Sequence, residues 1–158
     1  MTESPSNRGS TPVGAVADLD TIEAEAVLYL RLWANGPLSQ AQVWNDFASA
    51  LGARQGAKAL KSFETICKIC ATHGRRPLRC RHVTCTCLGA DEACFANIVG
   101  SASEGAREDA LMIAMNIVRP DMAAALVSMA EDVGLALRRM ALKTDRHRAV
   151  SPANHTIH

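Results

Sequence analysis

Apolar residues recur at helical spacing along most of the chain, returning every three or four positions. The stretches with this spacing cover about residues 21–33, 39–51, 54–73, 91–99 and 107–118. A sixth stretch begins at Pro120 and carries Met122, Leu126, Met129, Val133, Leu137 and Met140 on one stripe. No alternating pattern longer than four residues indicates a strand. The sequence therefore predicts an all-α fold, a compact bundle of about five to six helices.

Capping signals divide this pattern into separate helices. Asp20 followed by Glu23, and Ser39 followed by Gln42, match the capping box, in which a polar side chain accepts a hydrogen bond from the backbone three residues later. Asp91 is of the type that caps a helix start, and it precedes the fourth apolar stretch. We therefore expect helices to begin at these three positions.

Both ends of the chain lack periodic apolar residues. Residues 1–17 are rich in Ser, Pro, Gly and Thr and contain no apolar run of the kind found in secretory signals. We expect disordered segments at 1–17 and 144–158, the second with solvated histidines, and one helical domain over 18–143. No stretch approaches the length of a membrane span, so we expect a cytoplasmic protein that does not contact membranes.

Cysteine is the unusual component of the composition. Eight of the eleven Cys and His residues fall within residues 67–94: Cys67, Cys70, His73, Cys80, His82, Cys85, Cys87 and Cys94. In a reducing compartment a disulfide framework is disfavoured, which leaves metal ligands, reactive thiols or core residues. Most of these residues lie in a long loop over 73–90, between the third and fourth helices, and loops of such length are usually functional, disordered or pinned.

A metal ion is the first candidate for pinning this loop. Zinc takes four sulfur or nitrogen donors tetrahedrally, and its binding energy would replace the apolar burial that the loop lacks. We expect His82, Cys85 and Cys87 to be ligands, with Cys80 or His73 as the fourth. The spacing matches no common zinc pattern. An iron–sulfur cluster is the less favoured cofactor, because no ferredoxin spacing is present.

Three cysteines have an alternative role as core residues. Cys67 and Cys70 continue a helical stripe from Leu60 and Phe63, and Cys94 precedes another aromatic residue. Free cysteine is among the most buried residue types. We therefore leave open whether these three thiols pack in the core or bind the metal.

The near-neutral net charge conceals a basic block. Residues 54–81 hold eight basic residues and one acidic residue, a net charge of +7, whereas residues 1–53 carry −4 and residues 82–158 carry −2. Four arginines of this block lie in or beside the loop: Arg75, Arg76, Arg79 and Arg81. They could contact DNA or an acidic protein, lower nearby thiol pKa values, or balance a metal–thiolate centre.

Catalysis has little support in the sequence. No Gly-rich phosphate loop, G-x-S-x-G or H-E-x-x-H motif is present, and Asp91 with Glu92 is better interpreted as a helix start than as an acid–base pair. No small-molecule substrate is indicated. We predict a non-catalytic zinc-binding protein with a binding or regulatory role. The alternative is a thiol-based redox or metal-responsive regulator that contacts DNA through residues 54–81.

Overall fold

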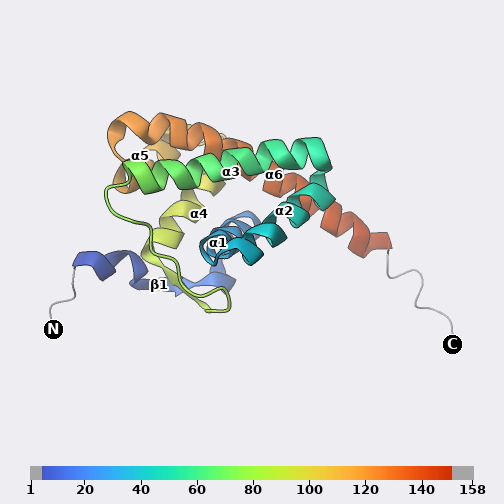
Figure 1. Ribbon diagram of the computed structural model, residues 1–158, viewed down its shortest axis with the longest axis horizontal. Helices are drawn as coiled ribbons and strands as arrows, with labels where there is room; N and C mark the ends of the chain where they lie inside the picture. Colours follow the sequence, from blue (N-terminus) through green and yellow to red (C-terminus); the bar gives the residue numbers. More distant parts are fainter. Residues whose placement is uncertain (1–4, 151–158) are drawn as a thin grey trace.

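The computed structural model describes the backbone of residues 5–150 and the side chains of residues 8–147. Its described part is mostly helical, with one small two-stranded sheet, which confirms the all-α prediction. Figure 1 shows the arrangement of the helices. Their bounds are α1 Thr21–Ala34, α2 Pro37–Leu51, α3 Ala53–His73, α4 Ala90–Ser103, α5 Arg107–Ile117 and α6 Pro120–Val150.

Helix α4 lies at the centre of the fold and packs on α1, α5 and α6 (Figure 1). Its sequence is apolar or small around most of its circumference, which is typical of a helix covered on several sides. Phe95, Ala96, Ile98 and Val99 are all at most 2% exposed. The start of α4, which carries the end of the long loop, is therefore anchored in the core.

Helices α3 and α6 pack along each other and complete the core with α2. The predicted stripe of α6 is confirmed, because Leu126, Val133, Leu137 and Met140 are buried and the two other methionines pack against the same core. Aromatic contacts join three of the helices: the Phe63 ring of α3 packs edge-to-face on Trp33 of α1 and on Phe95 of α4, with ring centroids 5.7 and 6.3 Å apart.

One of the three predicted helix starts is confirmed. Asp20 caps α1, and its Oδ1 accepts a hydrogen bond from the Glu23 backbone N–H at 2.8 Å. The prediction at Ser39 was wrong, because α2 begins at Pro37, whose fixed φ suits the first helical position. The prediction that Asp91 is a cap was also wrong, because α4 begins at Ala90 and the Asp91 side chain turns toward the loop.

Residues 5–17, part of the segment that we expected to be disordered, are ordered and pack against the end of the loop. After a 3-10 helix at Pro5–Ser10, strand β1, Pro12–Ala15, pairs antiparallel with β2, Cys87–Gly89, and a second 3-10 turn leads into α1. Figure 1 shows the blue β1 beside the end of the loop, below α4. The physical reason for the difference is that two short segments without a strand pattern satisfy each other's backbone hydrogen bonds.

The C-terminal boundary also differs from the expected one. Helix α6 continues past residue 143 to Val150, and His147 lies on it as an exposed residue. The expected tail histidines His155 and His158, like residues 1–4, lie outside the described residues. Among the described helices, none has the length and apolar character that crossing a membrane would require.

Candidate functional site

The second half of the loop is fixed to the core by the carboxylate of Glu92. Its Oε1 accepts a hydrogen bond from the Gly89 backbone N–H at 2.9 Å, and its Oε2 accepts one from the Arg81 backbone N–H at 3.2 Å. Glu92 is fully buried on the first turn of α4. One side chain therefore closes the loop by binding its backbone at two places eight residues apart.

Arg31 of α1 completes this arrangement. Its guanidinium forms a bidentate ion pair with Glu92, with Nε–Oε2 and Nη2–Oε1 distances of 2.5 and 2.9 Å. It also donates to the backbone carbonyls of Cys85 at 2.7 Å and Cys87 at 2.8 Å. Burial alone would raise the pKa of Glu92, but the hydrogen bonds from Arg31 and from the loop backbone outweigh it and lower the pKa.

The first half of the loop is fixed by the neighbouring carboxylate of Asp91. It accepts two hydrogen bonds from the Arg76 guanidinium, at 2.6 and 2.8 Å, and one from the Arg79 backbone N–H at 2.8 Å. The Asp91 side chain is 6% exposed and that of Arg76 is 42% exposed. Asp91 and Glu92 thus hold the two halves of the loop separately, although they are adjacent in sequence.

The hydrogen bonds of Asp91 and Glu92 hold the loop in place. This is the role for which the sequence suggested a metal ion. Arg31 was not among the residues predicted from the sequence. The signal that could have revealed it is a charged residue between Leu30 and Leu32, on a helix face that also carries Val27. A buried arginine requires an acidic partner. The acidic pair directly after the loop is where that partner lies.

Cys85 is the thiol with the most activating surroundings. Its Sγ lies 3.9 Å from Arg81 Nη1. The pKa of Cys85 is lowered by a hydrogen bond from the Cys87 backbone, then by Arg81, with a smaller contribution from Arg31, while slight burial opposes them. Cys87, two positions later, is exposed. The turn therefore presents one activated thiol and one accessible thiol.

The other cysteines are buried or half-buried and less acidic. Burial raises the pKa of both Cys67 and Cys70 to about 12, and that of Cys80 to about 11. Burial also raises the pKa of Cys94. All four belong to or pack against the main apolar cluster. This placement agrees with the core interpretation of Cys67, Cys70 and Cys94, and it adds Cys80 to the same group.

The predicted metal ligands lie in three places. His82, Cys85 and Cys87 lie within six consecutive residues: the Cys85 backbone N–H closes a turn by donating to the His82 carbonyl at 2.9 Å, and Cys87 is the first residue of β2. Cys80 is half-buried and packs against the main apolar cluster, as Cys67 does. His73 ends α3. Within residues 8–147, whose side chains are described, no group of three or more His, Cys, Asp or Glu side chains is arranged to hold a metal ion, and the zinc site stays a prediction.

The four loop arginines predicted to contact nucleic acid all make contacts inside the protein. Arg76 pairs with Asp91, Arg81 Nη2 donates to the Ser10 carbonyl at 2.6 Å, and Arg75 Nε donates to the Met115 carbonyl at 2.7 Å. The backbone of the fourth, Arg79, also bonds to Asp91. These arginines hold the loop in place, and their contacts with DNA are an untested prediction.

The exposed part of the basic block lies on α3. Arg54, Lys58, Lys61 and Lys68 are exposed at spacings of three, four and seven, which places them on one stripe of the helix. In the described part of the chain, none of them forms an ion pair. Thr65 and Thr72 continue the same α3 stripe, and the half-buried Glu64 is the one acidic residue beside it, three positions after Lys61 and four before Lys68.

Comparison with known proteins adds no relative. No protein-family model matches the chain, and neither the curated proteins nor the solved structures give a match.

Proposed function

We propose that this chain is a small regulatory protein whose segment at residues 85–87, between the turn of the loop and β2, responds to thiol-reactive oxidants. The observation that carries the proposal is that the Arg31 guanidinium binds the backbone carbonyls of Cys85 and Cys87 while it pairs with Glu92 in the core. A chemical change at either thiol therefore acts on a group that connects α1 with α4. We propose no catalytic role.

The reaction expected at this turn is a two-electron oxidation by a hydroperoxide. The Cys85 thiolate attacks the peroxide oxygen, an S–O bond forms, the O–O bond breaks, and the displaced oxygen leaves as hydroxide or alkoxide. The Cys87 thiol then attacks the sulfur of the sulfenic acid, a disulfide forms, and water leaves. Cys85 is the attacking residue because Arg81 and the Cys87 backbone lower its pKa.

The disulfide would alter the Arg31 contacts. Joining two side chains that are only two residues apart constrains the backbone between them. Both carbonyls cannot then keep their present direction toward the Arg31 guanidinium without strain. We expect oxidation to release at least one of these hydrogen bonds. Because the Arg31 side chain is 2% exposed, a released N–H group would be a buried donor without a partner, which is destabilising.

The experiment is oxidation of the purified protein with one equivalent of hydrogen peroxide, followed by mass spectrometry and hydrogen exchange. We expect a two-dalton loss mapped to the peptide with Cys85 and Cys87, and faster amide exchange at residues 85–89. Cys87→Ser should instead accumulate a sulfenic acid on Cys85 that reacts with dimedone. Cys67→Ser is the matched control and should oxidise like the wild type. Oxidation that begins at Cys67 or Cys70, or no change in exchange, would contradict the proposal.

The surface through which a regulatory partner would be contacted is the α3 stripe. Its four basic residues span about four helical turns, with Glu64 as the single acidic residue among them, and this excess of positive charge suits a phosphate backbone or another acidic surface. This keeps the predicted DNA contact within residues 54–81 but assigns it to α3 in place of the loop. Binding of duplex DNA should weaken steeply with salt, and the charge-removing variant Lys58→Gln/Lys61→Gln should reduce that slope by about two.

Zinc binding is a second candidate, because His82, Cys85 and Cys87 lie within six consecutive residues. His82 Nδ1 lies 2.8 Å from Thr84 Oγ1, which leaves Nε2 as the nitrogen that could bind a metal. Elemental analysis would then find close to one zinc per chain, lost in Cys85→Ser and Cys87→Ser and retained in Cys67→Ala. Protein without metal, in which every accessible thiol titrates freely, would exclude this candidate.

A further inference from the structure

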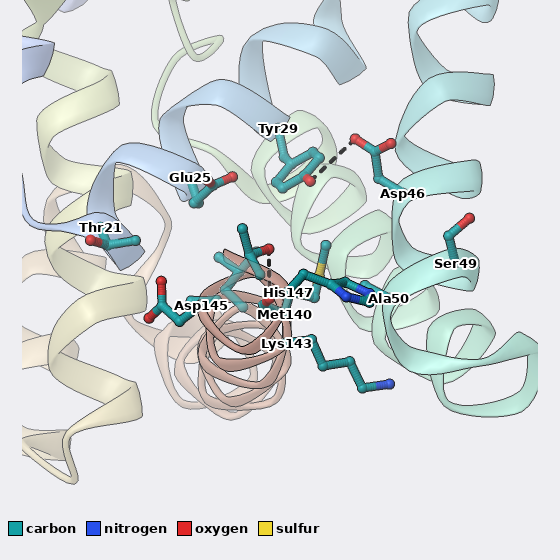
Figure 2. A pocket seen from close by; sticks show the side chains of 13 residues that line it. Thr21, Glu25, Tyr29, Asp46, Ser49, Ala50, Met140, Lys143, Asp145 and His147 are labelled. Atoms are coloured by element: carbon teal, nitrogen blue, oxygen red, sulfur yellow. Dashed lines mark hydrogen bonds between the residues drawn. The ribbon is translucent and has the colours of Figure 1, made fainter. Parts of the chain in front are cut away.

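A groove remains at the opposite side of α1, away from the face that meets α4. It lies between α1, α2 and the C-terminal half of α6, and its volume is about 550 Å³ (Figure 2). Small-molecule sites in proteins have volumes of this order, and a bare ion would fill little of such a space. The groove shares no residue with the thiol turn, so an inference from it is independent of the proposed function.

One wall of the groove is acidic. Glu25 of α1 and Asp46 of α2 line it, and between them the Tyr29 hydroxyl donates to Asp46 Oδ2 at 3.3 Å (Figure 2). Burial raises the pKa of Glu25, and the Asp46 carboxylate raises it further. Two carboxylates from different helices thus repel each other across a partly desolvated space.

No basic side chain of the described residues neutralises this pair. Neither Glu25 nor Asp46 forms an ion pair within residues 8–147. Lys143 and His147 line the α6 side together with Asp145, and Figure 2 shows the Lys143 side chain extending away from the two carboxylates. The net charge of the lining therefore favours a cationic occupant.

The floor of the groove is apolar. Leu137 and Met140 of α6 lie below the carboxylates, and Ala50 of α2 closes the same side. Leu137 and Met140 are core residues whose outer edges reach the groove. A ligand that fits this lining has a cationic end for the carboxylates and a short apolar chain for the floor.

We propose that the groove between α1, α2 and α6 binds a small organic cation, an ammonium or guanidinium group carried on a short alkyl chain. Glu25 and Asp46 accept its hydrogen bonds, and the alkyl chain covers Leu137 and Met140. The bound cation also removes the repulsion between the two carboxylates. Charge-assisted hydrogen bonds of this kind are stronger than neutral ones.

The test is a titration of isotopically labelled full-length protein, followed by amide chemical shifts. The probes are hexylamine and agmatine, and hexanol is the neutral match for hexylamine. We expect saturable shifts around Glu25, Asp46 and Met140 with both amines, and affinity for hexanol lower by about tenfold or more. Hexanol binding as tightly as hexylamine, or no saturable shift with either amine, would overturn the proposal.

Isosteric variants locate the site. Glu25→Gln and Asp46→Asn should each weaken hexylamine binding by about tenfold, which corresponds to one charge-assisted hydrogen bond. Glu131→Gln, on an exposed position of α6 outside the groove, is the control and should bind like the wild type. Equal affinity in all three variants would show that the amines bind elsewhere and would overturn the assignment. The comparison of hexylamine with hexanol on the wild type does not depend on whether a variant folds.

Discussion

Arg31 and Glu92 form a bidentate ion pair 61 residues apart in the chain, and their side chains are 2% and 0% exposed. The pair also binds four backbone groups of the loop, at Arg81, Cys85, Cys87 and Gly89. Replacement of a buried ion pair by well-packed apolar residues is often neutral or stabilising. This one differs because the loop backbone depends on both of its members.

Removal of either partner should therefore be strongly destabilising. We expect Arg31→Met or Glu92→Leu to lower the free energy of unfolding by about 3–5 kcal/mol, because each leaves a buried charge without its partner. The double variant should recover only part of this loss, since the loop carbonyls and N–H groups still lack their partners. Urea denaturation of the four proteins measures these differences, and full recovery in the double variant would contradict a role in holding the loop.

Alkylation should distinguish the thiols. At pH 7 we expect iodoacetamide to modify Cys85 faster than a thiol of the same exposure with an ordinary pKa, because the lowered pKa of Cys85 increases its thiolate fraction. Cys67 and Cys70, with pKa values near 12, should react only on unfolding. Arg81→Gln should slow the reaction of Cys85 severalfold and leave Cys87 unchanged, as followed by peptide mass spectrometry. A uniform slowing of both thiols would indicate a general change of the loop instead.

The acid side of the stability profile should depend on Glu23. Burial and the neighbouring Asp20 raise its pKa from 4.5 to about 7. Between these pH values the folded state binds more protons than the unfolded state, so stability falls as pH rises from about 4.5 to 7. Glu23→Gln should flatten this part of the profile, measured as the melting temperature against pH. The exposed-site variant Glu131→Gln should keep the wild-type slope.

Close packing of α4 on α6 should make Gly134 intolerant of a side chain. A Cβ at Gly134 would lie 2.5 Å from Ser103 Cβ and 2.9 Å from the Val99 carbonyl oxygen. Gly134→Ala should cost about 1–3 kcal/mol, although alanine is ordinarily the better helix former. Gly100→Ala is the comparison, because its Cβ would meet only the flexible side chain of Glu23 at 3.2 Å or more. Equal thermal stabilities of the two variants would contradict this reading of the interface.

Helical periodicity was sufficient to predict most of the fold. The α6 stripe and the Asp20 cap were correct because they depend on contacts within one helix or on one apolar face. The cap predictions at Ser39 and Asp91 failed because proline at position 37 and the tertiary role of Asp91 outweigh the local signal. The β1–β2 pair could not be predicted, since neither segment has an alternating pattern and their pairing depends on the folded core.

The candidate site was predicted only in part. The sequence located the loop but left open whether Cys67, Cys70 and Cys94 pack in the core or bind a metal, and it placed Cys80 with the loop ligands, whereas all four belong to or pack against the main apolar cluster. It did not reveal what holds the loop. Arg31 lies more than fifty residues before the turn that it binds, and spacing along a chain carries no information about such a contact.

The pairing of β1 with β2 has a consequence for the order in which the molecule folds. Pro12 and Gly89 meet only after most of the chain between them has been placed, and contacts of such sequence separation form late because closing a long loop is entropically costly. Helices α1, α3 and the start of α4 form largely from local contacts. A newly made chain should therefore pass through a stage in which the helices are assembled while β2 still lacks its partner strand β1, so that the segment from Cys85 into β2 is fixed only by its contacts with Arg31 and Glu92.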